Sequence, residues 1–183
     1  MTPRSRMVSI ETISIVFTGL SVSLAAFYYI STLRNAQRTQ QLQLETRQAQ
    51  LFMQIYQQFI SKDFKLSYLD IINNWSWDDF DDFIRKYVAD IENNSKWDIV
   101  GSFFEGVGVL VKRGLVNPAL VDDLMSGHTL MSWEKMEPVY LEIRRRWNWP
   151  QIAEWWEYLY NEIKAIASEQ HPELLDRRIS ILE

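Results

Sequence analysis

The feature that most constrains this chain is an uncharged apolar run near its N-terminus, from Ile13 to Leu33. These 21 residues contain no proline, aspartate, glutamate, lysine or arginine. As an α-helix they extend about 30 Å, which matches the hydrocarbon thickness of a bilayer. The run therefore predicts a transmembrane helix, and the lipid bilayer is the first expected partner.

The residues at the end of this run are typical of a membrane interface. Tyr28 and Tyr29 approach the boundary, and Arg34 and Arg38 follow it. A cleaved signal peptide is one alternative, but its apolar stretch would span only about 7–15 residues. A buried helix of a soluble domain is another, because several serines and threonines make the run only moderately apolar.

Small residues on this helix suggest a contact face. Gly19 and Ser23 lie four residues apart, and such spacing permits close helix approach in lipid. Small residues are also common in membrane helices without any contact role. Three arginines follow the run (Arg34, Arg38 and Arg47), and two precede it. Since basic residues favour the cytoplasmic side, we expect a single-pass protein of the cell membrane with a cytoplasmic domain.

Residues 34–61 predict a polar helix that continues out of the membrane. This segment holds nine glutamines and no glycine or proline. Its second half carries an apolar stripe at helical spacing, which needs a partner in its own domain or in another chain. The stripe consists of Leu51, Phe52, Ile55, Tyr56, Phe59 and Ile60.

The rest of the chain predicts short helices, so the expected fold class is all-α. The helices are expected at 64–73, at 77–92 behind a Ser76 cap, at 96–113 before Gly114, from Asn117-Pro118 to about 126, from Ser132 to Trp147, and at 150–168. Pro138 lies inside the helix that Ser132 caps, and is expected to kink it or to mark its true start. The segment 93–95 is expected to separate two of them. The domains expected are a flank (1–12), the transmembrane helix (13–33), the Gln-rich juxtamembrane helix (34–61), a soluble domain of five to six helices (62–169) and a tail (170–183).

Composition and charge exclude several classes of function. The chain has no cysteine, which excludes disulfides and thiol nucleophiles. Residues 63–105 contain ten acids and four bases, and so acidic a domain makes nucleic acid an unexpected partner. We find no catalytic or cofactor signature, and we expect no cofactor, no metal and no small-molecule substrate.

Three local patterns have an ordinary structural interpretation. The acidic residues Asp78, Asp79, Asp81 and Asp82 lack the calcium-loop spacing and are explained by helix capping and a solvated face. His128 and His171 are expected in loops without a role. Gly106 and Gly108 lack a third glycine for a dinucleotide fingerprint, so close helix packing is the expected reason for them.

Two groups of residues are candidates for an interaction surface. Arg144, Arg145 and Arg146 stand beside Trp147 and Trp149, although a helix C-terminus alone also favours arginine. The aromatics of the last helix exceed what one buried face needs. Those aromatics are Trp155, Trp156, Tyr158 and Tyr160.

The order of several motifs resembles a known family. The stretch FFEGVGVLVKRGL at 103–115 is followed by Trp133-Glu134, Pro138, Arg144-Arg145 and WEYL at 156–159. Together they resemble the prokaryotic family catalogued as domain of unknown function 4760. The resemblance implies a membrane helix, a polar stalk and a small helical domain over nearly the whole chain. It implies no activity and no site.

The expected function is a non-catalytic, membrane-tethered interaction or scaffolding module that binds a protein partner or itself. One alternative is an accessory subunit of a larger membrane complex, with Leu51, Phe52 and Ile55 facing a foreign chain. Another is a membrane-acting effector. The last is an enzyme that uses carboxylates such as Asp98, Glu105 or Asp122.

Overall fold

The computed structural model describes residues 9–170, and every regular element in that range is helical. This confirms the predicted all-α class. The elements are α1 (Ile10–Phe59), α2 (Lys62–Asn74), α3 (Phe80–Phe83), the π-helical turn η1 (Ile84–Val88), α4 (Ile91–Lys112), α5 (Pro118–Trp147) and α6 (Glu154–Gln170).

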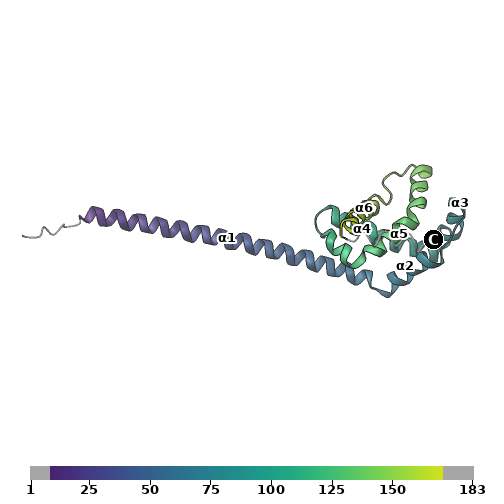
Figure 1. Ribbon diagram of the computed structural model, residues 1–183, viewed down its shortest axis with the longest axis horizontal. Helices are drawn as coiled ribbons and strands as arrows, with labels where there is room; N and C mark the ends of the chain where they lie inside the picture. Colours follow the sequence, from purple (N-terminus) through teal and green to yellow (C-terminus); the bar gives the residue numbers. More distant parts are fainter. Residues whose placement is uncertain (1–8, 171–183) are drawn as a thin grey trace, which may run out of the picture. The chain divides into compact units, whose positions relative to one another are not determined.

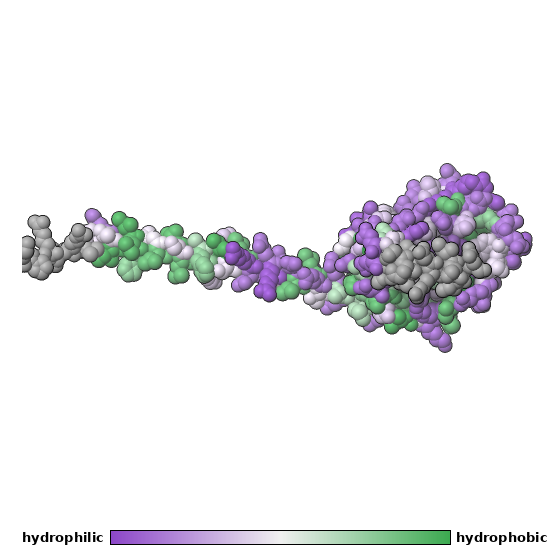
Figure 2. All heavy atoms as spheres, viewed as in Figure 1, coloured by the Kyte–Doolittle hydropathy of each residue, from purple (hydrophilic) through white to green (hydrophobic). Residues whose placement is uncertain are grey.

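The chain divides into two units, Met1–Arg47 and Gln48–Glu183. In the first unit, α1 meets the length and composition of a candidate membrane span. Its apolar side chains are exposed, including Phe17, Leu24 and Phe27. Figure 2 shows that hydrophobic residues dominate the N-terminal part of α1 and that hydrophilic ones follow.

In the second unit, the end of α1 packs into a helical core. Phe52, Ile55 and Phe59 are buried there. Helix α6 packs on both α4 and α5, and α2 packs on α4 (Figure 1). The core is rich in aromatic pairs, such as Phe64 with Phe103, whose ring centroids lie 4.5 Å apart.

Several helix ends follow the predicted capping residues. The Asn117 side chain accepts a hydrogen bond from the Ala119 N–H, and Pro118 occupies the first turn of α5. Helix α4 ends at Lys112, and Gly114 then adopts φ 67°, a left-handed conformation that glycine tolerates. Helix α2 also lies where the apolar pattern predicted it.

The helix predicted at 77–92 is wrong in both its cap and its end. Asp79, not Ser76, caps α3 by accepting from the Asp82 N–H at 2.8 Å. Asp90 then starts α4 by accepting from the Asn93 N–H. Residues 93–95 therefore lie in the first turns of α4 rather than in a break, because a strong N-cap precedes them.

The break predicted between about 126 and Ser132 is also wrong, since α5 runs unbroken through Gly127. Thr129 donates to the Met125 carbonyl, and Ser132 donates to the His128 carbonyl. These hydroxyls are thus satisfied inside the helix and do not cap a new one. Pro138 lies within α5, and this residue is exposed to solvent.

The last helix begins later than predicted, at Glu154 rather than Pro150. Residues 148–153 form a tight connection, with positive φ at Asn148 (50°) and at Ala153 (56°). The predicted tail beyond Gln170 lies outside the described residues.

Candidate functional site

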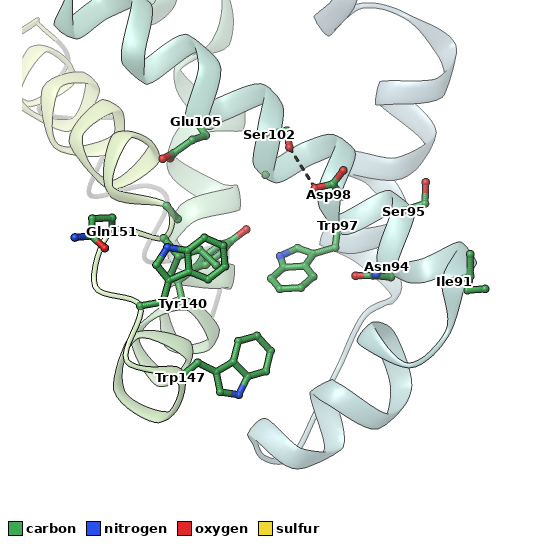
Figure 3. A pocket seen from close by; sticks show the side chains of 14 residues that line it. Ile91, Asn94, Ser95, Trp97, Asp98, Ser102, Glu105, Tyr140, Trp147 and Gln151 are labelled. Carbon is green, nitrogen blue, oxygen red and sulfur yellow. Dashed lines mark hydrogen bonds between the residues drawn. The ribbon is translucent and has the colours of Figure 1, made fainter.

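A cavity of about 660 Å³ lies in the second unit, between α4 and the connection from α5 to α6. We call it the α4 pocket (Figure 3). Its lining consists of Ile91, Asn94, Ser95, Trp97, Asp98, Gly101, Ser102, Glu105, Tyr140, Trp147, Trp149, Gln151, Ile152 and Ala153.

One face of α4 supplies most of the polar groups in the α4 pocket. Asp98, Ser102 and Glu105 follow at intervals of four and three residues, which places them on one side of a helix. The Ser102 hydroxyl donates to Asp98 Oδ1 at 3.3 Å (Figure 3). Asp98 and Ser102 are exposed. Both side chains are therefore accessible to solvent at the pocket.

Glu105 connects the α4 pocket to the start of α6. Its Oε2 atom accepts from the Trp156 N–H at 2.8 Å. A carboxylate at this position compensates N–H groups that have no partner within their own helix. Burial raises the pKa of the Glu105 carboxyl, and the backbone N–H groups of Trp156 and Trp155 partly oppose this.

Aromatic side chains form the apolar part of the α4 pocket. Figure 3 shows Trp97, Tyr140 and Trp147 around the same space. Trp97 and Tyr140 pack with ring centroids 5.8 Å apart. Trp147 and Trp149 are 49% and 52% exposed, which is high for the largest apolar side chain. Two tryptophans thus stand open to solvent at one pocket.

The Tyr140 hydroxyl is held in place by close packing. A Cβ at Gly101 would lie 2.8 Å from this oxygen, so only glycine lets α4 approach it so closely. Burial raises the pKa of the Tyr140 hydroxyl above its ordinary value. The group therefore stays neutral over the physiological pH range.

The connection that closes the α4 pocket is fixed by an arginine. Arg144 donates from Nε to the Ile152 carbonyl at 3.0 Å and pairs with Glu157 at 2.6 Å. Ala153 lines the pocket wall with a left-handed backbone, a conformation costly for a residue with a Cβ. The connection therefore has a set shape that the surrounding contacts impose.

The predicted membrane-interface residues all lie on α1. Tyr28, Tyr29, Arg34 and Arg38 are exposed in the first unit. Gly19 and Ser23 also lie there, and the Ser23 hydroxyl donates to the Gly19 carbonyl at 2.9 Å.

Most of the apolar stripe of the predicted stalk is not a free surface, although Ile60 at its end is 51% exposed. Phe52, Ile55 and Phe59 are buried in the second unit, and Leu51 packs against the same core. The sequence left open whether the stripe packs on its own domain or on another chain, and the structure shows that it packs on its own domain. The expectation that these residues form an outward interaction surface is therefore wrong, because the core needs their apolar side chains.

The basic and aromatic candidates for an interaction surface also divide into buried and exposed residues. Trp156 is fully buried against Phe104, with centroids 5.1 Å apart, so its place on an interaction surface is also wrong. Trp155 is half-buried. Arg144 supports the connection, and Arg145 remains exposed in a pair with Glu142.

Two ordinary interpretations need correction. His128 is not in a loop: it lies within α5, where Phe59 packs edge-on against its ring at 4.9 Å. Asp82 is not on a solvated face, since it is 5% exposed and pairs with Arg85 and Lys86. His171 lies outside the described residues. Among residues 9–170, no group of three or more histidines or carboxylates is arranged to hold a metal ion.

The two mid-helix glycines have different environments. A Cβ at Gly108 would meet the Trp155 carbonyl oxygen at 2.0 Å, so close packing of α4 on α6 explains this glycine. A Cβ at Gly106 would meet nothing within 4 Å. Close packing therefore accounts for Gly108 alone.

The carboxylates considered for chemistry do not all meet. Asp98 and Glu105 both line the α4 pocket, two turns apart on α4, while Asp122 is buried elsewhere on α5. The sequence did not indicate the pocket itself. The pair of tryptophans Trp147 and Trp149 could have indicated it. Because three arginines precede them, the segment was interpreted as a basic patch instead.

The comparisons with known proteins identify the family. Neither the curated proteins nor the solved structures gave a match. The family model of a domain of unknown function, DUF4760, matches residues 14–163, which covers most of α1 and all of α2 to α5. Since this match spans well over half of the chain, the protein belongs to the DUF4760 family.

Proposed function

We propose that this protein is a non-catalytic, membrane-tethered interaction module that uses the α4 pocket to hold a protein partner. The observation that carries the proposal is the pair of exposed tryptophans, Trp147 and Trp149, at the rim of a pocket of about 660 Å³. Exposed aromatic residues at a concave site are typical of binding surfaces.

The tether is supported by α1. Its first part has a mean hydropathy of 1.8 over 18 residues, and none of that window is buried. A soluble protein rarely exposes so long an apolar surface. In a bilayer the same side chains lie in hydrocarbon, so exposure costs nothing there.

The positive-inside rule supports a cytoplasmic location for the second unit. Arg34, Arg38 and Arg47 follow the span, against two arginines before it. We therefore place the α4 pocket on the cytoplasmic side, where a cytoplasmic or membrane-bound protein reaches it.

Site-specific photo-crosslinking in intact cells tests the proposal. A photoreactive phenylalanine derivative at Trp149, which keeps an aromatic ring at the rim of the α4 pocket, should give a discrete higher-mass band. The same amino acid at Asp123, an exposed α5 position outside the pocket lining, serves as the matched control and should give none. A band at both positions, or at neither, would contradict a partner site at the pocket.

The mass of the crosslinked band separates the forms of the proposal. A band at twice the mass of the chain indicates self-association. A stoichiometric foreign subunit indicates an accessory role in a larger complex, and a substoichiometric partner indicates a regulated scaffold. Each of these outcomes supports binding at the α4 pocket.

A further inference from the structure

The α4 pocket has an excess of negative charge that nothing in its lining neutralises. Asp98 and Glu105 are its two carboxylates, and its lining within the described residues contains no lysine, arginine or histidine. Asp98 accepts only the Ser102 hydroxyl and takes part in no ion pair among those residues. An exposed, unpaired carboxylate beside aromatic rings is available to a ligand.

The basic side chains around the α4 pocket are already engaged. Lys96 pairs with Asp70 at 3.1 Å and with Glu92 at 3.0 Å. Arg144 pairs with Glu157 at 2.6 Å through Nη1 and donates from Nε to the Ile152 carbonyl, while its buried Nη2 atom has no hydrogen-bond partner among the described residues. Each of these carboxylate partners lies outside the pocket lining. The protein's own cations therefore do not compete for Asp98.

The aromatic rings of the α4 pocket favour the same charge. A ring face attracts a cation, and tryptophan does so best. Trp97, Trp147, Trp149 and Tyr140 all line the pocket. Aromatic faces combined with a carboxylate match a guanidinium group, which stacks on a ring and forms two parallel hydrogen bonds to a carboxylate.

The chain contains an internal example of this recognition beside the α4 pocket. The Arg146 guanidinium lies 4.8 Å from the Phe80 ring centroid and pairs with Asp81 and Glu142 at 2.6 Å. Phe80 in turn packs against Trp147, a lining residue, at 6.1 Å. The pocket offers an external arginine the same two kinds of partner.

We propose that the α4 pocket binds an arginine side chain of the partner protein, with Asp98 as its counter-ion and the exposed tryptophans stacked on it. This inference rests on the proposed function, since it names the chemistry of the partner at the same site. Glu105 adds negative potential at the inner end of the pocket while it holds the start of α6.

Calorimetric titration of the full chain in a non-ionic maltoside detergent tests the inference. The probe is a short capped glycine–serine peptide that carries two arginines. The comparison peptide carries citrulline in their place, which keeps the planar shape but removes the charge and replaces one NH2 donor group with a carbonyl acceptor. We expect the citrulline peptide to bind at least about tenfold more weakly, and the arginine peptide to weaken as salt rises.

Variants of the full chain locate the binding. Asp98→Asn and Trp149→Ala should each weaken the arginine peptide about tenfold, whereas Trp149→Phe, which keeps an aromatic face, should retain most of the affinity. Asp123→Asn removes an exposed carboxylate outside the α4 pocket and should change nothing. Asp98 and Trp149 are exposed, so all of these variants should fold as the parent does, which circular dichroism checks.

Three results would overturn the inference: equal binding of the arginine and citrulline peptides, no binding of either, or a loss in Asp123→Asn equal to that in Asp98→Asn. A lysine peptide or free choline that binds more tightly than the arginine peptide would also overturn it, because the site would then select another cation. If crosslinking at Trp149 still captures a partner, the proposed function stands and only the arginine is wrong.

Discussion

Gly108 sets how closely α4 and α6 approach at the start of α6. A Cβ at this position would lie 2.0 Å from the Trp155 carbonyl oxygen and 2.6 Å from its carbon. Backbone atoms cannot rotate away as a side chain can. The helix axes must therefore separate to accept any larger residue, and Trp156, which is buried beside them, would lose its packing.

We predict that Gly108→Ala destabilises the fold by about 3 kcal/mol, because overpacking against backbone forces the helices apart. Urea unfolding of the second unit, followed by tryptophan fluorescence in the full chain, measures the change.

Gly106→Ala is the matched control for this prediction. It makes the same substitution two residues away, where a Cβ meets nothing within 4 Å. It should stabilise the fold by up to about 1 kcal/mol through helix propensity. Equal effects of the two variants would show that close packing is not the reason for Gly108.

The sequence predicts the identity of such residues better than their environment. It indicated close packing for the Gly106 and Gly108 pair, but only the contact with Trp155 separates them. It placed Asp82 on a solvated face and Trp156 on a surface, and both are buried. Burial depends on which helix lies opposite, and helical periodicity does not contain that information.

The last turn of α5 shows how charge acts on a whole element. Glu142 pairs with Arg145 and Arg146, both at 2.6 Å. Their hydrogen bonds lower the pKa of the Glu142 carboxyl from 4.5 to about 2. The folded-state pKa is thus below the unfolded value, so this stabilisation is complete above pH 4.5 and is lost as the pH falls toward 2.

We predict that acid unfolding responds to this cluster. Between pH 4.5 and 2, the parent chain should lose more stability than Glu142→Gln, which has no carboxyl to protonate. The midpoint of thermal unfolding, measured across this range, tests the difference. Parallel curves for the two chains would contradict the link between the pairs and the stability of α5.

Asp123→Asn is a suitable control for the acid series. Asp123 is exposed on the same helix and forms no ion pair among residues 9–170. Its pH dependence of stability should follow that of the parent. Raising the salt concentration should also reduce the difference between the parent and Glu142→Gln, because exposed ion pairs are screened.

Helix identity was more predictable than helix boundaries. Local signals correctly predicted the start of α5 at Asn117-Pro118 and the end of α4 before Gly114, because caps act through neighbouring backbone groups. Gly127 and Ser132 carried equally strong local signals for a break, but buried residues on both sides of them hold α5 as one helix. Tertiary packing overrode the local preference there.

The candidate site depends on still longer-range contacts. The sequence indicated Asp98 and Glu105 as candidate carboxylates on one predicted helix, but it did not indicate a shared pocket. The α4 pocket forms only because the connection 148–153 closes over that helix, held by Arg144. Ala153, which lines the pocket wall, has a left-handed backbone. Alanine does not favour this conformation, so the sequence does not predict it.

At the scale of the whole molecule, two findings matter most: the protein belongs to the DUF4760 family, and α1 contains a candidate membrane span. The proposed function depends first on the tether, because a soluble chain would meet different partners. Arginine at the centre of a membrane span costs about 2.5–3.5 kcal/mol for each residue. Two such substitutions therefore test the span without touching the second unit.

Extraction of cell membranes with alkaline carbonate is the most direct test of the tethered module. We predict that the full chain stays in the membrane pellet and that the double variant Leu20→Arg with Leu24→Arg moves to the supernatant. The matched double variant Leu42→Arg with Leu44→Arg, in the polar part of α1, should stay in the pellet. Release of the unaltered chain by carbonate would contradict the account.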